Sequence, residues 1–222
     1  MRNLIITIAF LFSFLLNGQN PGKVYYKDVA DGCVKDLFYS LNDAIHEGDT
    51  TTAKELTNKL TNNCIKGKYL SKHTFKTLNK ELLSTESISK PMVITIAAPW
   101  CPPCWSEIDA LNALVDKYDD QMEFIVLFWD KKNKVKEMVP KYDKRIHLVA
   151  SKKPYLENQE NPNYGNDFKH NLGVPNSYII DKEKKIVNFL MGAVYPNKNI
   201  NQEQANKKNI ARLECAIQPI LN

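Results

Sequence analysis

The segment Trp100-Cys101-Pro102-Pro103-Cys104 constrains this chain more than any other part of it. It follows a short apolar run over residues 92–97 and precedes a stretch with helical periodicity. A strand in this place delivers two cysteines to the first turn of a helix, where backbone N–H groups have no partner within the helix and the peptide dipoles leave partial positive charge. A thiolate is stabilised there, so its pKa falls, and residues three apart share one helix face. The pattern therefore predicts a reactive dithiol of Cys101 and Cys104.

Residues 1–19 have the character of a secretory signal peptide. Arg2 precedes an apolar run from Leu4 to Leu16, and polar residues follow it. The run is too short for a membrane-spanning helix, which needs about twenty apolar residues. We expect cleavage near Gly18 or Gln19 and an exported, periplasmic protein. Because Leu16 occupies a position where a small residue is preferred, an uncleaved membrane anchor stays open.

The charge of the chain is weakly basic. The sequence has 30 Lys and Arg residues against 25 Asp and Glu, and residues 1–20 account for one Arg and no acid. The remaining net charge of +4 is spread along the chain, which argues against a nucleic-acid partner. About 200 residues after the signal suffice for one full domain and a small annex.

Residues 20–67 read as a helical hairpin extension. Apolar residues recur with helical spacing over 33–47 and again over 53–65, and Gly48-Asp49 separates the two runs, with Thr50 or Thr51 as the cap of the second. Cys33 and Cys64 lie at equal distances from this turn, so we expect them side by side in a structural disulfide. On the chain-entropy model, closing that loop contributes about 3–4 kcal/mol. Two unpaired buried thiols are the alternative.

Residues 68–222 alternate between strand and helix patterns. We expect strands within 68–76, at 92–97, 122–129, 145–150, 177–181 and 185–191, and helices around Leu78–Leu83, after Cys104, at 131–139 and at the C-terminus. The polar stretch 151–173 reads as a surface insertion that ends in a short helix over 167–171. This order predicts an α/β fold with a mixed central sheet flanked by helices.

The order of these parts resembles the thioredoxin superfamily, and within it the exported bacterial proteins of the TlpA and ResA kind. The residues that carry the resemblance are Ala98–Cys104 between strand and helix, Gly173-Val174-Pro175 before the strand 177–181, Gly192, and Glu107. The resemblance implies a thioredoxin-like fold over roughly residues 70–220. It also implies a cis peptide bond before Pro175, with Pro175 packed opposite the dithiol and the Val174 backbone exposed for pairing with an extended substrate.

Two positions depart from the family pattern. Thr95 stands where cytosolic thioredoxins carry a buried acid, so proton transfer by that route is not expected. Asn176 replaces the threonine that often follows the cis-proline, a change that bears on substrate choice. The flank Ala98–Cys101 is also similar to protein disulfide isomerases, so the direction of the redox reaction stays open.

Each cysteine of the dithiol has an expected role. Cys101 is predicted to be the exposed attacking thiolate and Cys104 the resolving thiol. The alternatives are a structural disulfide or half of a zinc site, but the four histidines show no paired ligand spacing. Trp100 is expected to lie over the dithiol and to contact substrate. No metal or cofactor is implied.

Glu107 and Cys215 each have two readings. Glu107 lies on the helix face of Cys104 and, by the resemblance, would exchange its proton; the alternative is a solvated helix carboxylate. Cys215 lies nearly opposite the apolar stripe of the last helix, which predicts either an outward thiol able to pair between chains or an inert, partly buried one.

The sequence thus favours an exported thiol–disulfide oxidoreductase that reduces disulfides in other proteins. The resemblance adds apocytochrome c as one substrate class and a membrane electron donor as partner. Disulfide formation or isomerisation is the second hypothesis. A non-enzymatic protein that binds copper(I) through Cys101 and Cys104, or acts as a scaffold, is the third.

Overall fold

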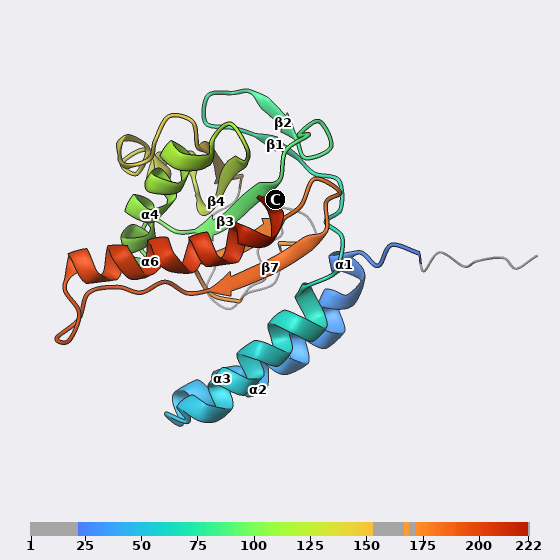
Figure 1. The fold of residues 1–222 in the computed structure, drawn as a ribbon, viewed down its shortest axis with the longest axis vertical. Coiled ribbons are helices and arrows are strands. Elements are labelled where there is room, and N and C mark those ends of the chain that lie inside the picture. The colour runs from blue at the N-terminus through green and yellow to red at the C-terminus, as the bar shows by residue number, and fades with distance from the viewer. Residues whose placement is uncertain (1–21, 153–166, 169–171, 222) are drawn as a thin grey trace, which may run out of the picture.

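The computed structural model describes residues 22–152, 167–168 and 172–221, and its centre is a five-stranded mixed sheet (Figure 1). The strand order is β5-β4-β3-β6-β7. The first three run parallel to one another, whereas β6 and β7 are antiparallel to their neighbours. The strands are β3 (Met92–Ala97), β4 (Glu123–Lys131), β5 (His147–Ser151), β6 (Asn176–Ile180) and β7 (Ile186–Met191). The mixed sheet that the sequence predicted is therefore present.

Alternate residues of each central strand point to opposite sides of the sheet, so both faces carry apolar side chains. Both faces are covered by other elements. One face carries Val93, Val126 and Phe128 and packs against α4 (Pro102–Tyr118) and α6 (Gln202–Ile217). The other face carries Ile94 and Leu127, which share a core with the start of the N-terminal extension. In Figure 1, α6 crosses one face of the sheet and the 3-10 turn η5 (Gln218–Ile220) follows it.

The N-terminal extension is a helical hairpin that projects away from the sheet (Figure 1). Its first arm comprises α1 (Tyr26–Val29), the π-helix η1 (Ala30–Val34) and α2 (Lys35–His46), and its second comprises α3 (Thr50–Lys59) and the π-helix η2 (Leu60–Ile65). Asp49 caps α3, accepting from the N–H groups of Thr51 and Thr52, so the expectation of a threonine cap is wrong: a carboxylate one residue earlier reaches both donors. A disulfide joins Cys33 to Cys64 at the base of the hairpin, with their Cα atoms 5.6 Å apart.

Two expected helices differ in the structure. β1 (Thr74–Lys76) lies within the strand expected at 68–76. The leucines at 78, 82 and 83 were expected in a helix, but they lie in the turn after β1 and in β2 (Leu82–Ser84), which pairs with β1 in antiparallel orientation. Lys80 takes a positive φ of 71° in the turn, and the N–H of Thr77 bonds to the carbonyl of Glu81. The charged helix expected at 131–139 shrinks to α5 (Lys132–Val135) and the 3-10 turn η3 (Val139–Lys141), because β4 extends to Lys131 and Pro140 lacks an N–H.

The end of the polar insertion is buried. Most of the predicted insertion and of its short helix lies outside the described residues, but Asp167 and Phe168 are 0% and 2% exposed. The Asp167 carboxylate accepts hydrogen bonds from the backbone N–H groups of Lys27 and Ser71 and contacts His73 Nε2 at 2.7 Å. The prediction of a surface segment is therefore wrong at this end, because one carboxylate connects three distant parts of the chain.

Among the described residues, no helix is both long and apolar enough to cross a membrane. The proposed signal at residues 1–19 lies outside the described residues.

Candidate active site

The dithiol lies where the parallel strand β3 leads into α4. Cys101 is the N-cap of the helix, and Pro102 and Pro103 occupy its first turn, where the missing N–H groups cost nothing because those donors have no helical partner. Cys101 and Cys104 form a disulfide with Cα atoms 5.3 Å apart. The backbone N–H of Cys104 points at the sulfur of Cys101, 3.2 Å away, so this sulfur faces the positive end of the helix.

Cys101 is less accessible than expected. The residue is 3% exposed and Cys104 is 2% exposed, so the prediction of an exposed attacking cysteine is wrong for this oxidised structure. The cause is its N-cap conformation, which turns the sulfur back over the first turn of α4 and toward the backbone of Val174. The carbonyl oxygen of Val174 lies 3.5 Å from Cys101 Sγ.

The loop before β6 forms the opposite side of the site. The peptide bond between Val174 and Pro175 is cis, as the resemblance implied. The N–H of Gly192 donates to the Pro175 carbonyl at 2.8 Å, and Gly192 has a φ of +68°, a conformation that glycine tolerates best. The side chain of Asn176 donates to the Gly173 carbonyl at 2.7 Å and thereby tightens the same loop.

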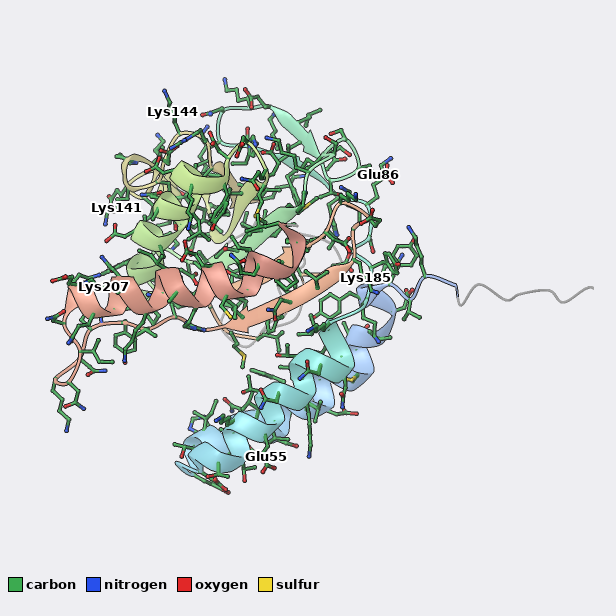
Figure 2. The ribbon with its side chains drawn as sticks, viewed as in Figure 1. Glu55, Glu86, Lys141, Lys144, Lys185 and Lys207 are labelled. Atoms are coloured by element: carbon green, nitrogen blue, oxygen red, sulfur yellow. A yellow bond between two sulfur atoms is a disulfide. The ribbon has the colours of Figure 1, made fainter. Side chains whose placement is uncertain are left out.

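Two tryptophans flank the dithiol. Trp100 is 50% exposed and donates from Nε1 to Asp130 at 2.9 Å, which links the loop after β3 to the C-terminal end of β4. Trp105 is 46% exposed, donates to the carbonyl of Pro99 at 2.7 Å, and has the ammonium of Lys141 5.5 Å from its ring centre. Lys141 extends from the surface in Figure 2. The sequence reading missed Trp105, although a tryptophan directly after the second cysteine was the available signal.

Glu107 is a buried residue of the dithiol helix, one turn after Cys104. It is 2% exposed, and its Oε2 has no hydrogen-bond partner among the described residues, so the alternative of a solvated helix carboxylate is wrong. Burial raises the pKa of Glu107 to about 7, and the positive charge of Arg212 opposes that rise. Its charge also contributes to the raised pKa of the buried Tyr142. A carboxyl group poised near neutrality beside a dithiol can accept and return a proton.

Thr95 occupies the position of the missing acid and forms no charged site. Its hydroxyl oxygen lies 2.8 Å from that of Ser177, and both residues are buried. Cys215 is the free cysteine of the described chain and is exposed on α6, so the alternative of an inert, partly buried thiol is wrong.

Two further residues of α6 form hydrogen bonds to the segments around the site. The sequence did not predict them. Asn209, 1% exposed, bonds to Ser106 of the dithiol helix and to Val194 beyond β7. Arg212 donates to the carbonyls of Met191 and Gly192. A single polar residue in an amphipathic helix gives no sequence signal that distinguishes it from a surface residue.

The strand order and the placement of the dithiol opposite a cis-proline define a thioredoxin-like fold. The chain matches the Redoxin family over residues 66–205, which is more than half of its length, and it belongs to that family. It is also 28% identical over 108 residues to the thiol-disulfide oxidoreductase ResA of Bacillus thuringiensis subsp. konkukian, a match covering 46% of this chain and 56% of ResA. The ResA of Bacillus cereus matches to the same extent. The chain thus spans about half the length of these relatives.

Two solved structures are similar in fold. A putative thiol:disulfide interchange protein DsbE from Chlorobium tepidum superposes with a TM-score of 0.51 at 16% identity, covering 71% of this chain and 98% of that one. A putative protein disulfide isomerase from Bacteroides thetaiotaomicron gives a TM-score of 0.50 at 19% identity, covering 70% and 89%. Both support the thioredoxin-like assignment of the fold.

Proposed function

We propose that this protein is a thiol–disulfide oxidoreductase that acts on disulfides in other proteins. The observation that carries the proposal is the Cys101–Cys104 disulfide at the N-terminus of α4, with Val174 and the cis-proline Pro175 directly opposite. A structural disulfide would not need a partner loop of this kind. The similarity to the ResA proteins supports the same class of reaction.

The reaction begins with the reduced dithiol. The Cys101 thiolate attacks one sulfur of a substrate disulfide, so that the substrate S–S bond breaks, one substrate thiolate leaves and a mixed disulfide forms. Cys104 then loses its proton and attacks the Cys101 sulfur. The second substrate thiolate leaves, the Cys101–Cys104 disulfide closes, and two electrons have passed to the substrate.

Glu107 is the proton acceptor in this proposal. Its carboxylate would take the proton of Cys104 before the resolving attack and return it when the dithiol is reduced again. The support is its burial on the dithiol helix, one turn after Cys104, and a pKa of about 7, which lets it change protonation state at neutral pH.

Substrate would bind between the Val174 loop and Trp100, over the dithiol. The backbone of Val174 is placed to pair with an extended segment, and Trp100, half exposed, offers an aromatic surface on the other side. In this binding mode Pro175 sets the shape of the loop.

We further propose that the protein is exported and works as a reductase in the periplasm. The support is the signal-like segment 1–19, which places the dithiol where oxidation prevails and where a reductase needs an electron supply. A membrane electron donor would reduce Cys101–Cys104 after each turnover. Apocytochrome c is one protein substrate that the resemblance suggests.

Disulfide formation or isomerisation is the second candidate, because the flank Ala98–Cys101 is similar to disulfide isomerases. The reduction potential separates the two. We expect a value near that of thioredoxin, about −270 mV, whereas a disulfide donor would lie near about −120 mV.

An insulin-reduction assay with dithiothreitol as the electron source tests the proposed function. Wild-type protein and the Cys215→Ser control should accelerate insulin precipitation, whereas Cys101→Ser should not exceed the rate with dithiothreitol alone. Equal acceleration by Cys101→Ser and wild type would show that the dithiol is not the site of the reaction.

A further inference from the structure

A groove surrounded by lysines lies beside the edge strand β5. It has a volume of about 460 Å³ and runs between the β1–β2 pair and the C-terminal end of β5. Its apolar lining includes Phe75, Leu78 and Val149, and Leu82, 74% exposed, stands at its rim. The lysines that line it come from three separate parts of the chain, namely Lys76, Lys80, Lys132 and Lys152.

The charged side chains among the described residues that line this groove are all lysines. No Asp or Glu is among the described residues that line it. Lys132 donates to the carbonyl of Leu78 at 3.0 Å, and this acceptor carries no negative charge. Of the carboxylates adjacent in sequence, Glu81 and Asp130 both lie outside the lining. An apolar floor with cationic walls complements a ligand that carries both apolar groups and carboxylates.

The groove and the dithiol both lie at the carboxyl ends of the parallel strands. Because β3, β4 and β5 are parallel, their carboxyl ends lie on the same side of the sheet. Cys101 follows β3, Lys132 directly follows β4 and Lys152 directly follows β5. Adjacent strands are about 4.8 Å apart, so the end of β5 is roughly 10 Å from that of β3. An extended chain of about three to four residues covers this distance.

We propose that this groove binds an acidic, extended segment of the protein substrate, about three to six residues from the cysteine that Cys101 attacks. This inference rests on the proposed function and adds to it a substrate class. The substrate would be held at two places, at Val174 beside the dithiol and at the lysine groove. Charge complementarity of this kind raises the association rate and selects among partners.

Synthetic peptides of about twelve residues test this proposal. Each carries one cysteine joined in a mixed disulfide to 5-thio-2-nitrobenzoate, with three Glu, three Gln or three Lys placed four to six residues from the cysteine on either side. All proteins in this test carry Cys215→Ser, because the exposed Cys215 thiol would also attack these disulfides. Each protein is first reduced and freed of reductant. The Cys101 thiolate attacks the peptide sulfur, the coloured nitrobenzoate thiolate leaves, and Cys104 then displaces the peptide thiolate. Stopped-flow absorbance gives the second-order rate constant.

The test variant combines Lys76→Gln, Lys80→Gln and Lys152→Gln. The control combines Lys54→Gln, Lys59→Gln and Lys66→Gln, which removes the same charge from the helical hairpin. Glu55, labelled in Figure 2, marks that hairpin, which projects away from the sheet. All six lysines are exposed.

For the wild type at low salt, the Glu peptide should react roughly tenfold faster than the Gln peptide, and the Lys peptide slower than both. This preference should vanish in the test variant and at about 0.5 M NaCl, where charges are screened within a few ångströms. It should persist in the control. Equal rates for the Glu and Gln peptides, or equal losses in both variants, would overturn the groove assignment while the proposed function stands. Failure of every peptide to release the chromophore would overturn both.

Discussion

The side chain of Asn209, on α6, donates a hydrogen bond to the carbonyl oxygen of Ser106, on the dithiol helix, at 3.0 Å. The same amide group donates to the carbonyl of Val194 at 2.7 Å and accepts from its N–H at 2.8 Å. The segment that contains Val194 begins at Gly192, which bonds to Pro175. Asn209 therefore connects the helix that carries the two cysteines with the segment behind the cis-proline loop, and it is a positioning residue for both sides of the site.

Replacing Asn209 should change the redox properties of the dithiol. Asn209→Ala removes the hydrogen bonds to the N–H and carbonyl of the half-buried Val194 and one hydrogen bond to the Ser106 carbonyl, and each buried group left unsatisfied costs about 1–3 kcal/mol. We expect kcat/KM for insulin reduction to fall roughly tenfold, the effect of about 1.4 kcal/mol on the barrier, and the reduction potential to move from the wild-type value. Asn206→Ala is the control, because Asn206 also links α6 to α4, through Asp109, but away from the dithiol. An unchanged potential and kcat/KM in folded Asn209→Ala would contradict the positioning role.

The raised pKa of Glu107 should make stability depend on pH. The folded oxidised protein keeps this carboxyl protonated up to about pH 7, whereas in the unfolded chain its pKa is about 4.5. Between these values the folded state binds more protons, so the free energy of unfolding should fall as pH rises from 4.5 through 7, by up to about 3 kcal/mol. Urea unfolding at intervals from pH 4.5 to 8 measures this slope.

Glu107→Gln should flatten this pH dependence and lower turnover at pH 7.5, because the amide cannot accept the proton of Cys104. The matched variant Glu203→Gln removes an exposed carboxylate from α6 and should keep the wild-type slope. If Glu107→Gln has wild-type turnover over the whole pH range, Glu107 is not the proton acceptor.

Removing the disulfide of the extension should affect stability more than chemistry. The double variant Cys33→Ser/Cys64→Ser should lose about 3–4 kcal/mol of unfolding free energy, since the loop of 31 residues is no longer closed in the unfolded chain. Insulin reduction at a temperature where the variant is folded should match the wild type. Cys215→Ser, which removes an exposed free thiol, is the control and should change neither quantity. A loss of activity in the folded double variant would assign the extension a part in the reaction.

The buried carboxylate of Asp167 should contribute to the free energy of unfolding. Asp167→Ala leaves the N–H groups of Lys27 and Ser71 without their acceptor and removes the partner of His73, a change we expect to cost about 3 kcal/mol. Chemical denaturation measures the free energy of unfolding of Asp167→Ala. Glu55→Ala, which removes an exposed carboxylate from α3, is the comparison. Equal stability of the two variants would mean that Asp167 does not hold the extension to the domain.

The central part of the fold was predictable because its periodicities are strong. The buried run of β3, the helical spacing after Cys104 and the pair β6–β7 each follow from the residue pattern alone. The strand expected within 68–76 is present as β1, whereas β2 was mistaken for part of a helix, since three leucines within six residues do not distinguish a helical from a strand period. The division of the chain between residues 67 and 68 into extension and domain stays a prediction.

Contacts between distant segments were not predictable in the same way. Asp167 lies in a polar stretch, and only the tertiary structure brings it to His73 and Lys27. Asn209 likewise gains its partners from two other elements. The burial of Cys101 depends on the approach of Val174, 73 residues further along the chain. Sequence spacing pointed to the dithiol and the family resemblance to Glu107, whereas the surroundings of both required the fold.

Trapping of the mixed disulfide tests the central claim most directly. In Cys104→Ala the resolving thiol is absent, so the attack by Cys101 should stop after the first step. Reduced protein incubated with a disulfide-containing peptide should gain the mass of one peptide chain, and digestion without reductant should locate that chain on Cys101. Attachment of the peptide to Cys215 and not to Cys101 would contradict the account. So would a Cys104→Ala protein that gains no mass from the peptide, although a small disulfide still reacts with its Cys215.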